Sequence, residues 1–407
     1  MACTVETTIC GTVHVTGAGP ISYGVFRAGK TPADLVLMEV GGPGANALAR
    51  TDRQTLGLPT QIDKYDVLLI NEPWVSATAT RECTRAMTEF TKSVILASTP
   101  SAKPIGAQCS LPVWTQDRYT TALKAVLAQL GRPLAGIVGH SYGALPAAAA
   151  ALAFPHAWLI LNAPIATPDT PGSEVMSQRI KSINQELDRS YQSHCAALGL
   201  DCGSAGHEIA EKAISTITTV TVPSRANALS KGDFAAAIIG SLYGLGENAT
   251  WLWTTIAKIA SLDEVTRAQV ARMADQILMR YGDNQISERL AAFIKGTCNS
   301  YQQWPIQRPS GAVLHTFFDH VTYQCGLAAP ASSPWDVRNL RARPRNACVY
   351  SNLTDPVTPS IWAHKWVEIF GDDVAANTYT HQGHTTLSVA LKLTQDNSCA
   401  LLNGDTR

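Results

Sequence analysis

The sequence has no long apolar run and no excess of charge of either sign. Of its 407 residues, 32 are basic and 32 are acidic, with no block of Lys or Arg. Proteins that bind nucleic acids or anionic membranes usually carry a cluster or an excess of positive charge, which this sequence lacks. Residues 144–161 are the most apolar stretch, but Pro146, Pro155 and His156 interrupt it, whereas a span needs roughly 18–20 apolar residues. We expect no membrane span and no nucleic-acid partner, and leave the oligomeric state open.

Metal-binding cysteine motifs are also missing. The ten cysteines form no C-x-x-C pair and no Cys/His zinc spacing, which favours disulfides over a metal site. Residues 1–10 show no signal peptide. Disulfides still predict a secreted or extracytoplasmic protein, with buried free thiols in a cytoplasmic protein as the alternative. The pairs nearest in sequence, whose connectivity spacing does not fix, are Cys3/Cys10, Cys83/Cys109, Cys195/Cys202, Cys298/Cys325 and Cys348/Cys399.

Short apolar runs recur in the first part of the chain, and helical patterns lie between them. Continuous runs, as opposed to alternating ones, are typical of parallel strands that are buried on both faces. The order of runs and helices predicts a doubly wound α/β sheet. The predicted strands are 35–40, 65–70, 136–138 and 158–161, and the predicted helices are 119–130 and 144–153.

From residue 167 the pattern becomes helical, and the strand pattern resumes at 347–351 and 378–381. We therefore predict an α/β body formed by residues 1–166 and 344–407. Residues 167–343 would form a large inserted helical cap, or lid, because amphipathic helices must bury their apolar faces. The amphipathic patterns lie at 174–198, 208–216, 264–281 and 286–295.

The strongest motif is Gly139-His140-Ser141-Tyr142-Gly143, between an apolar run and a helical pattern. A serine at a strand-to-helix turn adopts a strained backbone that exposes its hydroxyl, and the flanking glycines permit close packing. The pattern predicts that Ser141 is the nucleophile of an α/β-hydrolase fold. The other interpretation is a glycine-rich connection without chemistry.

A serine nucleophile needs an imidazole to accept its proton and a carboxylate to orient that imidazole. In this fold the acid and then the base follow the serine along the chain. Asp355 follows the 347–351 run and is the predicted acid; an ordinary turn aspartate is the alternative. His384 is the predicted base, with His381 as its competitor.

Acyl transfer also needs two N–H donors for the oxyanion. The backbone N–H of Tyr142 is one candidate. The second should come from Gly41-Gly42-Pro43-Gly44, after the 35–40 run. Pro43 has no N–H, so Gly42 or Gly44 donates, and we favour Gly42.

Together these motifs resemble the tripeptidyl aminopeptidase and prolyl iminopeptidase branch of the α/β hydrolases. The resemblance also includes Tyr119-Thr120-Thr121 and Asp355-Pro356-Val357-Thr358-Pro359. It implies a serine peptidase that releases residues or short peptides from free N-termini under a helical cap. The chain departs from the family at Val40, where a histidine is usual, and at Asn71-Glu72-Pro73-Trp74, where Asp-Arg-Gly is usual.

Three functions remain open. An aminopeptidase leads; an esterase, thioesterase or acyltransferase on a small acyl substrate is the alternative, and a non-catalytic binding protein is third. No cofactor and no metal are expected. An aminopeptidase needs carboxylates to hold the substrate's ammonium group, and the candidates for that role are Glu72, Glu174, Glu208 and Glu247. A cleft without carboxylates would favour the ester-cleaving alternative.

Overall fold

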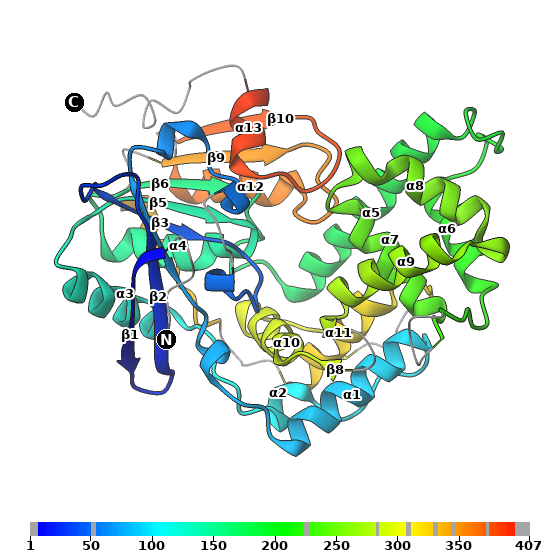
Figure 1. Ribbon diagram of the computed structural model, residues 1–407, viewed down its shortest axis with the longest axis horizontal. Helices are drawn as coiled ribbons and strands as arrows, with labels where there is room; N and C mark the ends of the chain where they lie inside the picture. Colours follow the sequence, from blue (N-terminus) through cyan, green and yellow to red (C-terminus); the bar gives the residue numbers. More distant parts are fainter. Residues whose placement is uncertain are drawn as a thin grey trace.

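The computed structural model describes residues 7–49, 54–222, 228–281, 285–306, 311–328, 333–342, 347–371 and 374–394. Its centre is an eight-stranded sheet in the order β1-β2-β4-β3-β5-β6-β9-β10 (Figure 1). β2 runs antiparallel to β1 and β4, and the other neighbours are parallel. The strands are β1 Thr7–Val15, β2 Gly19–Phe26, β3 Leu35–Glu39, β4 Asp66–Ile70, β5 Leu134–His140, β6 Trp158–Asn162, β9 Ala347–Asn352 and β10 Ala375–Tyr379.

The sheet is buried on both faces, as the continuous apolar runs predict. In β3, Leu35 and Leu37 join one hydrophobic cluster, while Val36 and Met38 join the other. The same alternation continues through β4, β5, β6 and β9. Both clusters exclude water, so the carboxyl ends of the central strands are held on a rigid support.

Helices cover the two faces of the sheet. α4 packs on β5 and β6, α12 packs on β9 and β10, and α13 lies against β9. These body helices are α3 Gln116–Leu130, α4 Ala144–Ala153, α12 Ser360–Phe370 and α13 Leu387–Leu393. The α/β architecture predicted from the sequence is therefore confirmed.

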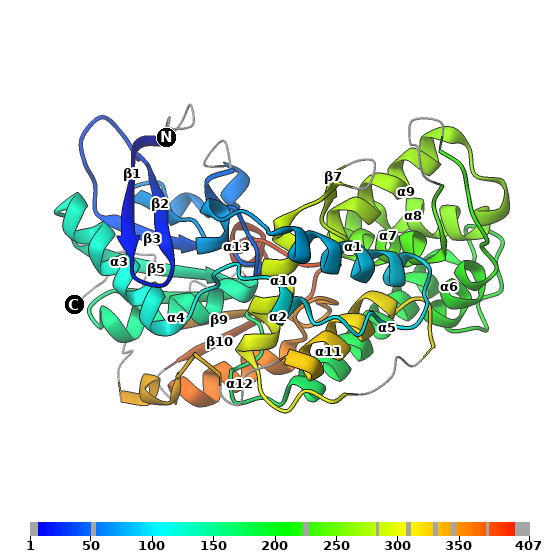
Figure 2. The same cartoon turned by 90° about the horizontal axis from the view of Figure 1, so that it is seen from below.

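A helical layer occupies the end of the molecule away from β1 and β2 (Figures 1 and 2). Between its described helices lies a short hairpin of two strands with two residues each, β7 Arg280–Tyr281 and β8 Gln285–Ile286. The helices are α5 Gly172–His194, α6 Gly206–Ser215, α7 Lys231–Leu242, α8 Leu245–Ala257, α9 Glu264–Ile277, α10 Glu288–Ser300 and α11 Thr316–Ala328. We call these helices the cap.

Two earlier helices also contact the cap. α1 (Arg81–Ile95) packs on α7, α10 and α11, and α2 (Ile105–Gln108) packs on α10 and α11. The division at residues 166/167 and 343/344 stays a prediction, and residues 343 and 344 lie outside the described residues. No described helix combines the length and the apolar character that crossing a bilayer requires.

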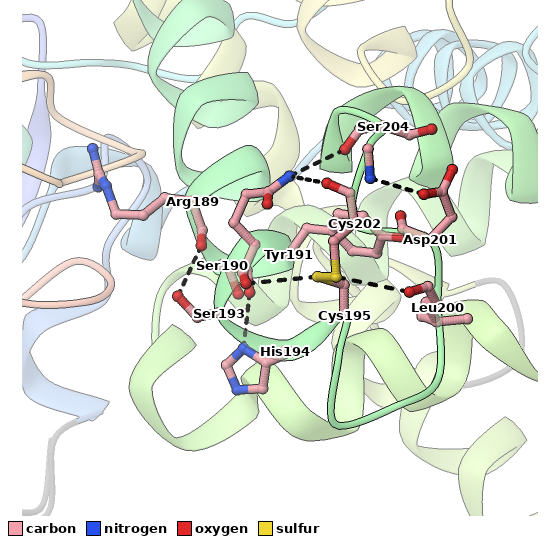
Figure 3. Close-up of a disulfide and its surroundings, with 12 residues drawn as sticks. Arg189, Ser190, Tyr191, Ser193, His194, Cys195, Leu200, Asp201, Cys202 and Ser204 are labelled. Carbon is pink, nitrogen blue, oxygen red and sulfur yellow. Dashed lines mark hydrogen bonds between the residues drawn. A yellow bond between two sulfur atoms is a disulfide. The ribbon is translucent and has the colours of Figure 1, made fainter.

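Three disulfides match pairs nearest in sequence: Cys83–Cys109, Cys195–Cys202 and Cys298–Cys325. Cys10 and Cys348 are also disulfide-bonded, and Cys3 and Cys399 lie outside the described residues. Cys195–Cys202 closes the loop after α5, where Tyr191 Oη also donates to the Asp201 carbonyl at 2.7 Å (Figure 3). Such bonds favour an oxidising compartment; secretion itself stays a prediction.

Candidate functional site

Ser141 lies at the sharp turn between β5 and α4. Its φ is +54°, in the left-handed region that non-glycine residues rarely adopt. A Cβ on Gly139 would lie 2.6 Å from the Ala147 Cβ, and one on Gly143 would lie 2.4 Å from the Glu39 carbonyl oxygen. The turn therefore requires glycine on both sides of the serine, because helix and strand approach too closely for a side chain.

Asp355 and His384 meet beyond the carboxyl ends of β9 and β10. Asp355 Oδ2 lies 2.7 Å from His384 Nδ1, and the aspartate side chain is fully buried. Its Oδ1 accepts the backbone N–H groups of Val357 and Thr358 at 2.8 and 2.9 Å, and Oδ2 accepts the Thr358 hydroxyl at 2.9 Å. These bonds fix the carboxylate, which can hold the proton on Nδ1 and leave Nε2 to accept another.

The two histidines of the loop have different partners. His381 Nδ1 lies 2.9 Å from the Gln382 carbonyl oxygen and is not bonded to Asp355. His140 lies beside His384, with ring centroids 4.7 Å apart, and its Nδ1 is 2.9 Å from Asn162 Nδ2. The hydrogen bonds thus favour His384 over His381 as the base. The sequence did not indicate that the His140 ring would contact the ring of His384.

The loop that carries His384 is attached to the cap. The backbone N–H of His384 donates to the Tyr243 carbonyl at 3.0 Å, at the junction of α7 and α8. A Cβ on Gly383 would lie 2.8 Å from the same oxygen. The loop therefore packs directly on the cap backbone.

Ser141 and His384 line one cavity of about 500 Å³ between body and cap. The described residues show no hydrogen bond between Ser141 and His384; such contacts often tighten only when substrate binds. Most of the cap wall is apolar or aromatic: Ile239, Leu242, Ile277, Phe293, Phe317 and Phe318. Substrate bound here would contact this apolar wall.

The Gly41-Gly42-Pro43-Gly44 loop lies against the serine turn. A Cβ on Gly41 would lie 2.8 Å from the His140 carbonyl oxygen and 3.1 Å from the Ser141 Cβ. The Gly44 N–H donates to Glu72, whereas the Gly42 N–H has no acceptor among the described residues. This supports the choice of Gly42, together with Tyr142, as the proposed oxyanion donors.

These observations assign the fold. A strained serine turn follows the central strand β5, and Asp355 and His384 follow later strands of a sheet in which β3 and β4 are exchanged in order. The fold is the α/β-hydrolase fold.

Comparisons with known proteins find similarity to solved structures at low sequence identity. No protein-family model and no curated protein matches the chain. Among solved structures, a homoserine O-acetyltransferase from Bacillus anthracis is 14% identical, with 97% of each chain covered and a TM-score of 0.48. A meta-cleavage product hydrolase from Pseudomonas fluorescens is 13% identical (98% of this chain, 99% of that one, TM-score 0.44).

A serine hydrolase from Cycloclasticus zankles is 14% identical over 94% of both chains, with a TM-score of 0.42. Likeness at this level carries no information on activity, because one fold serves many reactions. The fold assignment rests on the strand order and the serine turn described above. The resemblance to the aminopeptidase branch stays a prediction.

The glutamates proposed for an ammonium group lie elsewhere. Glu174 on α5 binds Lys365 Nζ at 2.9 Å and Gln178 at 2.7 Å, and Glu208 and Glu247 are exposed on α6 and α8. No Asp or Glu in the described part of the chain lines the cavity.

Two arginines line the cavity instead: Arg179 on α5 and Arg289 on α10. Neither arginine belongs to a motif that pointed to the site in the sequence. One signal was present, because Arg179 lies between Met176 and Ile183 on the apolar face of the α5 pattern.

Glu72 supports the oxyanion loop. Its carboxylate accepts the Gly44 N–H at 2.8 Å and the Ala45 N–H at 3.0 Å. Burial raises the pKa of Glu72 to about 7, and these two N–H groups oppose that shift. Burial likewise raises the pKa of Glu39 to about 8, although Tyr119 Oη donates to this carboxyl at 2.5 Å. The residues that depart from the family pattern at 71–74 thus include one that holds the Gly42 segment in place.

Replacing Glu72 with glutamine should lower kcat by about tenfold or more at pH 8 and change KM little, because a misplaced oxyanion donor acts on the transition state. The folded-state carboxyl ionises as pH rises through about 7, and only the ionised form accepts both N–H groups fully. The ratio of variant to wild-type kcat should therefore approach one toward pH 6.

Steady-state kinetics on a p-nitrophenyl ester between pH 6 and 8 measure this ratio. Glu247→Gln on the exposed face of α8 is the matched control and should leave kcat unchanged. A ratio for Glu72→Gln that is independent of pH would contradict the role of the ionised carboxylate.

Proposed function

We propose that the chain is a serine hydrolase that cleaves an ester of an apolar acyl group through an acyl-enzyme on Ser141. One observation carries the proposal: Ser141, in its strained conformation, and His384, which is hydrogen-bonded to the buried Asp355, line the same cavity, whose cap wall is mostly apolar. A constellation of this kind, with each member oriented by packing and hydrogen bonds, is what nucleophilic catalysis requires.

In the proposed reaction, Ser141 Oγ attacks the carbonyl carbon while His384 Nε2 accepts the hydroxyl proton. Asp355 stabilises the imidazolium without becoming protonated. The N–H groups of Gly42 and Tyr142 bind the oxyanion of the tetrahedral intermediate. His384 then gives its proton to the leaving alkoxide, and water activated by His384 hydrolyses the acyl-enzyme.

The charge of the cavity favours a substrate without an ammonium group. An aminopeptidase must bind the charged N-terminus, and burying that cation without a carboxylate costs several kcal/mol. The described cavity wall offers two guanidinium groups and no carboxylate. The peptidase hypothesis, taken from the resemblance, therefore ranks below ester cleavage.

A matched pair of esters tests this ranking. The p-nitrophenyl esters of 4-methylpentanoate and of leucine differ only in the ammonium group. We expect kcat/KM for the desamino ester to be higher by about tenfold or more, because about 1.4 kcal/mol of unfavourable charge burial already gives that factor. A preference for the leucyl ester, with cleavage of leucine p-nitroanilide, would restore the aminopeptidase hypothesis.

A further inference from the structure

We propose that Arg179 forms a subsite for a carboxylate on the substrate, so that the enzyme acts on esters whose apolar body also carries an acid group. This inference rests on the proposed function, because the carboxylate site is a substrate subsite only if the enzyme cleaves an ester in this cavity. It starts from the only cationic side chains that the described cavity wall presents, Arg179 and Arg289.

The guanidinium of Arg179 is held in a fixed place. Its Nε donates to the Val357 carbonyl at 3.1 Å, which ties α5 to the loop that carries Asp355. The rings of Phe318 and Trp362 lie 5.5 and 5.3 Å from its Cζ, within the range of cation–π contacts. Trp362 is fully buried, so at least this side of the subsite is rigid.

The remaining donors of Arg179 are unused. Among the described residues, neither Nη1 nor Nη2 has a hydrogen-bond acceptor, and no carboxylate lies within ion-pair distance. The negative charge of Asp355 is close enough to raise the pKa of Arg179. The oxygens of Asp355, however, already accept hydrogen bonds from His384 and from the Val357 and Thr358 segment. In the described part of the chain, the guanidinium thus lines the cavity without a carboxylate in ion-pair contact.

An uncompensated charge in a partly dehydrated site is unfavourable, and an anionic ligand would offset it. Burial lowers the pKa of Arg179, but arginine keeps its charge in proteins. With Nε occupied, the two Nη groups present parallel donors that match the two oxygens of a carboxylate. The aromatic and aliphatic wall beside them, which includes Ile183 and Phe318, would contact the apolar body of the substrate.

Arg289 is a weaker candidate for the same role. It is exposed at the start of α10, and the ionised Glu72 carboxylate lies near enough for the two charges to attract. Its Cγ also packs against the Gly44 segment. Arg289 is therefore the more exposed of the two arginines, and the carboxylate nearest Arg179, that of Asp355, is already bound to His384 and to the Val357 and Thr358 segment.

Binding without turnover tests the subsite. Calorimetry on the Ser141→Ala protein would compare 4-phenylbutyrate with 4-phenylbutanamide, which have the same shape and differ in charge. We expect the carboxylate to bind about tenfold or more tightly, the value of one charged hydrogen-bonded pair. Adding Arg179→Met should bring the two Kd values within about twofold of each other, and Arg179→Lys should restore part of the difference.

Arg272→Met is the matched control, because it removes the same charge from an exposed position on α9 outside the cavity. It should leave both Kd values unchanged. Equal Kd values for the two ligands, or a carboxylate preference that survives Arg179→Met, would overturn the proposal. These measurements do not depend on hydrolysis, so a protein that binds the carboxylate through Arg179 but cleaves no ester would refute the proposed function and keep the subsite.

Kinetics separate recognition from positioning. Mono-p-nitrophenyl adipate and its methyl ester differ by one negative charge. Arg179→Met should raise KM for the acid by about tenfold more than KM for the neutral diester, whatever change in kcat the two substrates share. Equal changes in KM and kcat for both substrates would mean that Arg179 acts only through the Asp355 loop, and would overturn the carboxylate subsite.

Discussion

Replacing Ser141 with alanine should reduce kcat by about 10⁴-fold or more, because the acyl-enzyme no longer forms. The loss should not come from unfolding. Only a hydroxyl is removed, at a turn whose shape is imposed by Gly139 and Gly143 and by packing against Ala147 and Glu39. The far-ultraviolet circular dichroism of the variant should match that of the wild type.

A fluorophosphonate probe provides the second measurement. It should label the wild type at Ser141 and leave Ser141→Ala unlabelled, while Ser173→Ala, at an exposed position on α5, should be labelled like the wild type. Unchanged labelling of Ser141→Ala would show that another residue is the nucleophile. Failure of the wild type to react would remove the proposed function altogether.

The second large effect concerns the base and the acid. His384→Ala should lower kcat by about 10⁴-fold or more, and Asp355→Asn by about 10⁴-fold, since the amide favours the wrong tautomer of the imidazole. Combining either change with Ser141→Ala should add little further loss, because the three groups act as one unit.

His381→Ala is the control for this prediction. Its imidazole is bonded to the Gln382 carbonyl and not to Asp355, so kcat should stay within about threefold of the wild type. An inactive His381 variant beside an active His384 variant would reverse the assignment. The measurement is the rate of ester hydrolysis near pH 8 by the wild type, His384→Ala, Asp355→Asn and His381→Ala.

Local patterns were enough to predict the sheet and the triad candidates. Apolar runs identified β3, β4, β5 and β6, because a strand buried on both faces is apolar at most positions; the buried polar residues Glu39, Asp66 and Asn162 lie at strand ends. The Ser141 turn, the Asp355 loop and the His384 loop each follow a strand, and the carboxyl ends of parallel strands meet at one edge of the sheet. Their meeting in space therefore follows from the fold class.

Other features depend on contacts that no local pattern contains. α7 is buried on nearly every side, from Phe234 to Ile239, so it has no amphipathic period and was not predicted. The end of β1 alternates exposed and buried residues from Thr12 to Val15, in contrast to the continuous apolar runs of the central strands. The role of Glu72 requires the end of β4 to lie beside the loop after β3, and only the pairing of these strands reveals that.

The hydrogen bond between the His384 N–H and the Tyr243 carbonyl joins the loop that carries the proposed base to the cap. If α7 and α8 swung away from the sheet to admit substrate, they would either break this bond or pull the imidazole away from Asp355. An open cap and a competent base would then exclude one another. In the proposed mechanism, the enzyme would be inactive while the cap is open. His384 would be in place to act as the base only after the cap closes over the substrate, so that closure of the cap would control catalysis.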